Sequence, residues 1–202
     1  MVWSRGVLAF LCFGVAGYAV FVYGFLPLGS VVHPDMRVSF ESHRALVYGH
    51  IFASALALVL GPLQFWAALR SAYPAVHRAM GRVYLGVGVL VGGVCGLLMA
   101  PQAYGGLTSS LGFGALAVAW LYSGLRAYRA IRSGNVALHR RWMVRNFALS
   151  FAAVTLRLWL PLSMGARLPF EVAYPVIAWL CWVPNVMIAE ILLRRQRILR
   201  DA

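Results

Sequence analysis

Two histidine-arginine pairs open apolar stretches of the chain in nearly the same setting. His77 lies in "AVHRAMGRVYLG" (75–86) and His139 in "ALHRRWMVRNFA" (137–148). Imidazole is a common axial ligand of haem iron, and guanidinium groups pair with carboxylates such as the haem propionates. The pattern therefore predicts a haem b site with His77 and His139 on the iron, and the alternative is that both histidines are anchors at the membrane interface. The residues assigned to this cofactor site are His77, Arg78, Arg82, His139 and Arg140.

A second set of polar residues lies inside apolar segments and comprises His50, Gln64 and Arg157. An ionisable group at membrane depth is costly, so it is a functional candidate unless a partner satisfies it. His50 and Gln64 share one helix face at about 100° per residue, and His50 and Arg157 lie at similar depth from one side. We expect His50 and Arg157 to face each other across a cavity, and the alternative is that backbone carbonyls or snorkelling satisfy each of them.

A glycine stripe follows His77 and comprises Gly81, Gly88, Gly92 and Gly96. Missing side chains on one helix face admit either a closely packed neighbouring helix or a flat cofactor. The stripe is therefore consistent with a porphyrin groove, although helix packing is the more frequent cause of such a pattern.

The composition is that of a membrane protein, because 62% of the residues are apolar against roughly 45–50% in soluble domains. All 18 basic residues are arginines and the net charge is +13. These arginines flank apolar segments, which favours anionic lipid over nucleic acid as the counter-charge. Hydrolytic motifs such as HExxH are absent from the sequence, which argues against hydrolytic chemistry.

Six stretches are long enough to cross a hydrocarbon core, which takes roughly 20 apolar residues per helix. We therefore expect an all-α polytopic membrane protein, a bundle of six transmembrane helices in a single domain over residues 1–202. The expected helices are about 7–28, 45–69, 80–100, 107–128, 143–163 and 172–193.

The arginines also predict the orientation of the bundle. Fourteen of them fall on the side of the two termini, three fall on the other side, and Arg157 lies within a span. Because cytoplasmic loops carry the excess of arginine, we expect both termini and both His-Arg pairs to face the cytoplasm, in the inner (plasma) membrane.

With these residues assembled, the chain resembles a family of multi-pass bacterial membrane proteins catalogued as a domain of unknown function. The resemblance covers about residues 45–160, and its name implies no activity. It rests on His50, "GPLQF" (61–65), Arg70, "HRAMGRVY" (77–84), "HRRWMVR" (139–145) and "TLR" (155–157).

The chain also has a more distant similarity to the cytochrome b561 and ferric-reductase-like proteins, helical bundles that carry electrons on b-type haems. That resemblance implies haem b as cofactor. Members of the group usually have four buried histidines in two pairs, whereas here His77 and His139 lie at helix ends, which argues against two haems.

The leading functional hypothesis is a b-type haem electron-transfer protein near the quinone pool, with a quinone or redox partner near His50 and Arg157. The alternative is a transporter or binding protein for a small molecule or anion, with a polar path at His50, Gln64 and Arg157. A non-catalytic accessory protein is the third. The sequence does not specify an enzymatic reaction, the oligomeric state or the role of the outer loop 29–43.

Overall fold

The computed structural model describes the backbone of residues 2–201 and the side chains of residues 6–195, and within this range it is helical and contains no strand. Five segments are long and apolar enough to cross a membrane, which confirms the prediction of an all-helical membrane protein. They are Gly6–Phe25, Arg44–Gln64, Pro74–Gln102, Val136–Gly165 and Phe170–Arg195. The predicted segment 107–128 forms the 27-residue helix α7, Gly106–Arg132, which is not among these five, so the count of six spans stays a prediction.

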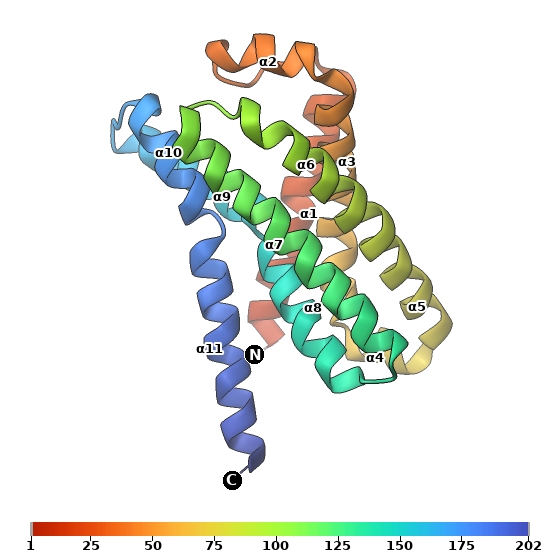
Figure 1. The fold of residues 1–202 in the computed structure, drawn as a ribbon. Helices are drawn as coiled ribbons and strands as arrows, with labels where there is room; N and C mark the ends of the chain where they lie inside the picture. Colours follow the sequence, from red (N-terminus) through yellow and green to blue (C-terminus); the bar gives the residue numbers. More distant parts are fainter. Residues whose placement is uncertain (1, 202) are drawn as a thin grey trace.

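The helices form one elongated bundle, with the short helix α2 lying across one end and both termini toward the other (Figure 1). We call the α2 end the outer end and the opposite end the inner end. The first half of the bundle contains α1 (Val2–Phe25), α2 (Arg37–Ser42), α3 (Arg44–Gln64), α4 (Ala67–Ala72), α5 (Pro74–Val83), the π-helical turn η2 (Tyr84–Val89) and α6 (Leu90–Met99). The second half contains α7 (Gly106–Arg132), α8 (Val136–Ser150), α9 (Ala152–Gly165), α10 (Phe170–Leu180) and α11 (Val183–Asp201).

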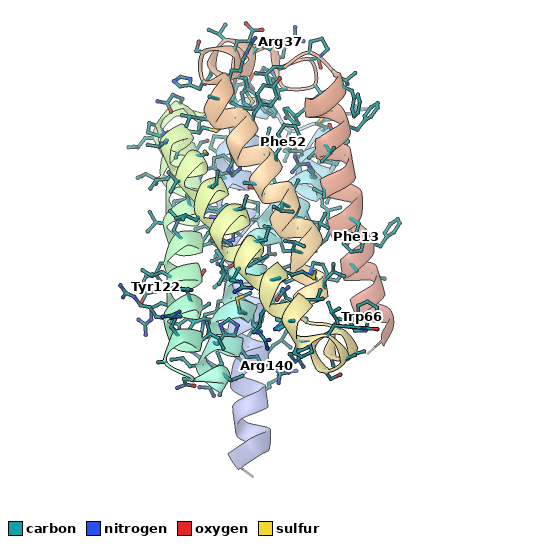
Figure 2. All side chains as sticks on the ribbon, turned by 90° about the vertical axis from the view of Figure 1, so that its right-hand side faces the viewer. Phe13, Arg37, Phe52, Trp66, Tyr122 and Arg140 are labelled. Carbon is teal, nitrogen blue, oxygen red and sulfur yellow. The ribbon has the colours of Figure 1, made fainter. Side chains whose placement is uncertain are left out.

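Large apolar side chains cover the outside of the bundle between its two ends. Figure 2 shows Arg37 at the outer end and Arg140 at the inner end, with Phe13 and Phe52 projecting outward between them. Phe13 is 41% exposed and Phe52 39%. An apolar exterior between two charged ends is the surface that a bilayer requires.

Two helix starts lie earlier than predicted. The helix predicted to start at 80 begins at Pro74, and the helix predicted to start at 143 begins at Val136. Proline at the first helical position has no amide hydrogen to leave unsatisfied, and the side chain of Asn135 caps α8 by accepting from the amide of Leu138 at 2.9 Å. Capping therefore overrode hydropathy in setting these two boundaries.

Three predicted spans depart from straight α-helices. α3 ends at Gln64, soon after Pro62, instead of continuing to 69. The last span divides into α10 and α11 at Cys181 and Trp182, because Pro184 cannot donate to the carbonyl of Leu180. The fifth span turns at Phe151 between α8 and α9, so a straight helix does not relate the directions of His139 and Arg157.

Candidate functional site

A cavity of about 300 Å³ extends from the outer end into the middle of the bundle. Asp35 and Tyr104 line it near the outer surface, and Trp120 and Ser150 line it at its deepest point. The lining also includes His50 and Arg157. The structure therefore brings two of the three residues of the predicted polar path to one cavity.

His50 enters this cavity from α3 and is oriented by the backbone of α6. Its Nδ1 donates to the carbonyl of Gly92 at 2.8 Å, because a carbonyl can only accept. In the neutral ring this leaves the lone pair on Nε2. Gly96 makes the close approach of the imidazole possible, since a Cβ there would lie 2.8 Å from the Nδ1 of His50.

Arg157 enters the same cavity from α9. Its Nη1 donates to the carbonyl of Ala153 at 3.0 Å, and its guanidinium lies 5.8 Å from the ring centre of Tyr18. Tyr23, which also lines the cavity, is close enough to interact with the same charge. Among the side chains of residues 6–195, no carboxylate forms an ion pair with Arg157. Its charge is therefore uncompensated within the described part of the chain.

The floor of the cavity is a buried hydrogen-bonded network that links η2, α7 and α8. The hydroxyl of Tyr84 donates to Oδ1 of Asn146 at 2.8 Å and lies 2.9 Å from Oγ of Ser150. The indole of Trp120 donates to the same Oγ at 2.9 Å. The amide nitrogen of Asn146 donates to Oγ of Ser123 at 2.8 Å and to the carbonyl of Trp120 at 2.9 Å. Such fully satisfied networks hold a buried surface in one arrangement.

Gln64 does not join His50 and Arg157. It lies near the inner end of α3 and is 7% exposed. Its Oε1 lies close to Gly81: a Cβ added to Gly81 would lie 3.2 Å from this oxygen. Its Nε2 is buried and has no partner among the described residues. Gln64 is not among the residues that line the cavity.

The outer loop covers the cavity. Met36, Phe40 and His43 line it from above. At its edge the imidazole of His33 stacks on Phe170 with ring centres 4.4 Å apart. The fold thus places the 29–43 loop over the site, a position that the sequence did not specify.

The rim of this cover carries carboxylates. Oδ2 of Asp35 lies 3.6 Å from Nδ1 of His33, and the side chain of Asp35 is 63% exposed. Nearby, loss of hydration together with the carboxylates of Glu171 and Asp35 raises the pKa of Tyr104 above its usual value. Both effects disfavour a negative charge at this rim.

The two histidines predicted as haem ligands lie near the inner end, in the first turns of α5 and α8, and neither lines the cavity. Nδ1 of His139 donates to the carbonyl of Ala127 at 2.9 Å, which leaves Nε2 free. Nδ1 of His77 is buried and has no partner among the described residues, and the two rings are near enough for electrostatic interaction. The predicted propionate partners are exposed on α5 and α8; they are Arg78, Arg82 and Arg140.

Imidazole is a common axial ligand of haem iron, but other side chains already lie against the glycine stripe. A Cβ on Gly88 would lie 2.9 Å from the Cβ of Ala57, and one on Gly92 would lie 3.1 Å from Oγ of Ser54. Side chains of α3 therefore fill the stripe, as expected of helix packing, the more frequent cause of such a pattern. The glycines are the contact at which α3 packs closely against η2 and α6.

Sequence reasoning missed several residues around the cavity. Tyr84 and Trp120 support its floor, and Tyr18 and Tyr23 flank Arg157. Aromatic residues are abundant in this chain, with nine tyrosines and seven tryptophans. Their type and spacing therefore gave no signal that separates these four from lipid-facing aromatic residues.

Comparison with known proteins identifies a family but no characterised relative. The family model described as "Predicted membrane protein (DUF2306)" matches residues 47–193. No curated protein and no solved structure matches the chain. The similarity to the cytochrome b561 group consequently has no support from these comparisons.

Proposed function

The chain belongs to the DUF2306 family of integral membrane proteins, and from its cavity we propose that it binds an amphipathic small molecule with an oxyanion head. One observation carries the proposal: Arg157, without a carboxylate partner among the described side chains, shares a mostly apolar cavity with His50. The charge distribution of the sequence favours the inner membrane as its location.

The uncompensated charge determines the chemistry of the head group. A cation removed from water costs several kcal/mol unless an opposite charge or several hydrogen bonds replace its hydration. Arg157 has one carbonyl partner and one tyrosine ring, which leaves most of its N–H groups free. A carboxylate can accept two of them in parallel, which makes it the most favourable occupant.

The apolar lining determines the rest of the ligand. Val47, Ile51, Leu116 and Leu156 line the walls of the cavity, so burial of a hydrocarbon chain there is favourable, at about 25 cal/mol per Å² of apolar surface. His50 adds one acceptor on Nε2 beside this apolar surface. The cavity therefore suits a carboxylate with an aliphatic or ring-shaped body better than a small hydrated anion.

Thermal unfolding of the purified protein in a non-ionic detergent tests the proposal. We expect dodecanoate to raise the unfolding temperature more than dodecanol, which has the same chain but no charge. At a ligand concentration of about 100 times Kd the stabilisation amounts to about 2.7 kcal/mol. Arg157→Gln should abolish the difference between the two ligands.

Arg44→Gln is the matched control, because Arg44 is an exposed arginine at the outer end of α3 and its loss should leave the effect of dodecanoate intact. The ligand-free Arg157→Gln protein should unfold at the same temperature as the parent or higher, since an uncompensated charge is removed. Equal stabilisation by dodecanol, or an unchanged response of Arg157→Gln, would contradict the proposal.

A second hypothesis rests on the sequence: the protein binds haem, transfers electrons and has a quinone as partner. The free Nε2 of His139 beside His77 favours a metal ligand, whereas the filled glycine face opposes a porphyrin. The absorbance of protein produced with ample haem supply distinguishes this hypothesis from a ligand-binding function without a chromophore.

A further inference from the structure

We propose that the ligand of this cavity is a long-chain carboxylate that enters from the bilayer, between α1 and α9, and keeps its tail among the lipids. This inference rests on the function proposed above and adds the substrate class and the route. The juxtaposition that carries it is the position of Arg157, which lines the cavity and at the same time lies against Tyr18.

Tyr18 belongs to the outside of the bundle. It is 48% exposed, and its neighbours Phe21 and Phe25 on α1 are 59% and 76% exposed, so this face of α1 contacts lipid. Tyr23, one and a half turns further along α1, lines the cavity. The guanidinium of Arg157 interacts with both tyrosines. The guanidinium of Arg157 is therefore close both to the lipid-facing surface of α1 and to the cavity.

The packing of α1 against α9 is close on the inner side of Arg157. Cys12 and Ala16 of α1 share a buried cluster with Val154 of α9, and these three residues are at most 2% exposed. Three residues beyond Val154 on α9, the guanidinium of Arg157 lies 5.8 Å from the ring centre of Tyr18, so a cation and an aromatic ring meet there in place of two apolar side chains.

The aqueous route passes two carboxylates. The rim near the outer surface carries Asp35, and Glu171 lies close enough to Tyr104 to act on it. The loop that contains Met36 and Phe40 covers the same opening. A negatively charged ligand that arrives from water would pass these carboxylates before it reached Arg157, whereas a ligand that arrives from the bilayer would meet the guanidinium first.

The response to tail length provides a criterion. If the cavity of about 300 Å³ is closed toward the lipid, its fixed volume limits the length of the tail that it can hold. If the tail leaves the cavity between α1 and α9, lengthening the tail beyond the opening does not weaken binding.

The experiment is a chain-length series on the full protein in lipid nanodiscs, with hexanoate, decanoate and hexadecanoate as probes. We expect the affinity, corrected for partition into the bilayer, to be equal for decanoate and hexadecanoate within about threefold. If hexadecanoate binds at least tenfold more weakly than decanoate, the cavity is closed toward the lipid and the inference is overturned. If none of the three binds, the proposed function itself fails, and the two failures are thus distinguishable.

A second measurement locates the tail directly. Hexadecanoate with a nitroxide at its last carbon should show lipid-like mobility and high accessibility to oxygen when it is bound to the protein. An immobilised nitroxide that is shielded from oxygen would place the tail inside the protein and refute lateral access. Arg157→Gln should release the bound fraction, while Arg44→Gln should retain it.

Discussion

The substitution Asn146→Ala should destabilise the bundle more than truncation of the exposed Asn135 cap of α8, because Asn146 joins three helical segments below the cavity. Its side chain makes three hydrogen bonds of 2.8 to 2.9 Å, to the hydroxyls of Tyr84 and Ser123 and to the carbonyl of Trp120, and it is fully buried. Hydrogen bonds between membrane helices contribute about 0.6 kcal/mol each on average, and about 1.7 at most. Their loss should therefore cost about 2 kcal/mol, with a further contribution from the unfilled space.

Reversible unfolding in mixed micelles of increasing sodium dodecyl sulfate content measures this cost as a change in the free energy of unfolding. The matched control is Asn135→Ala, which removes the single exposed hydrogen bond of the α8 cap and should cost about 1 kcal/mol. A cost for Asn146→Ala no greater than that of Asn135→Ala would show that the network does not hold these segments together. The same variant should also weaken dodecanoate binding, since Asn146 supports the cavity floor through Trp120.

Three further predictions follow from the packing, the histidine pair and the charge distribution. Gly61→Ala should lower the unfolding temperature by several degrees in thermal unfolding assays, because its Cβ would lie 2.3 Å from the Phe147 ring. Gly24→Ala, where a Cβ meets no atom within 4 Å, should leave that temperature unchanged, and equal effects would contradict the packing argument. If the protein binds haem b through His77 and His139, His139→Ala should change its reduced-minus-oxidised spectrum, and a colourless protein would end that hypothesis. Membrane-impermeant labels should reach tags on both termini only from the cytoplasmic side, and labelling of one terminus from each side would contradict the predicted orientation.

Sequence reasoning predicted the helical class because hydropathy and length depend on local composition alone. It also placed His50 and Arg157 at comparable depth, since depth follows from counting residues along a helix. It failed where the geometry depends on partners from distant segments. The filling of the glycine stripe by Ala57 and Ser54 is a tertiary fact, and so is the hydrogen bond between Tyr84 and Asn146.

Helix boundaries failed for a different reason. A hydropathy window averages over about 19 residues, whereas a boundary depends on one or two side chains. The Asn135 cap and the proline at position 74 extend two helices toward the inner end. As a result His77 and His139 lie in first helical turns, where their Nδ1 atoms point toward the bundle and not toward solvent.

The irregular helices around the cavity bear on why the site lies where it does. A backbone group in a membrane must find its partner within the protein, which regular helices provide by themselves. At the interruption before α11 the carbonyl of Cys181 is instead bound by the side chains of Thr155 and Asn185. These side chains substitute for a lost helical bond, and Cys181 itself lines the cavity. The turn at Phe151 similarly lies between Ser150 on the cavity floor and Ala153, whose carbonyl holds Arg157. Irregular backbone of this kind is tolerated in a membrane where it lines a cavity. The turn at Phe151 thus separates the hydrogen-bonded network at the cavity floor from α9, which carries the uncompensated Arg157.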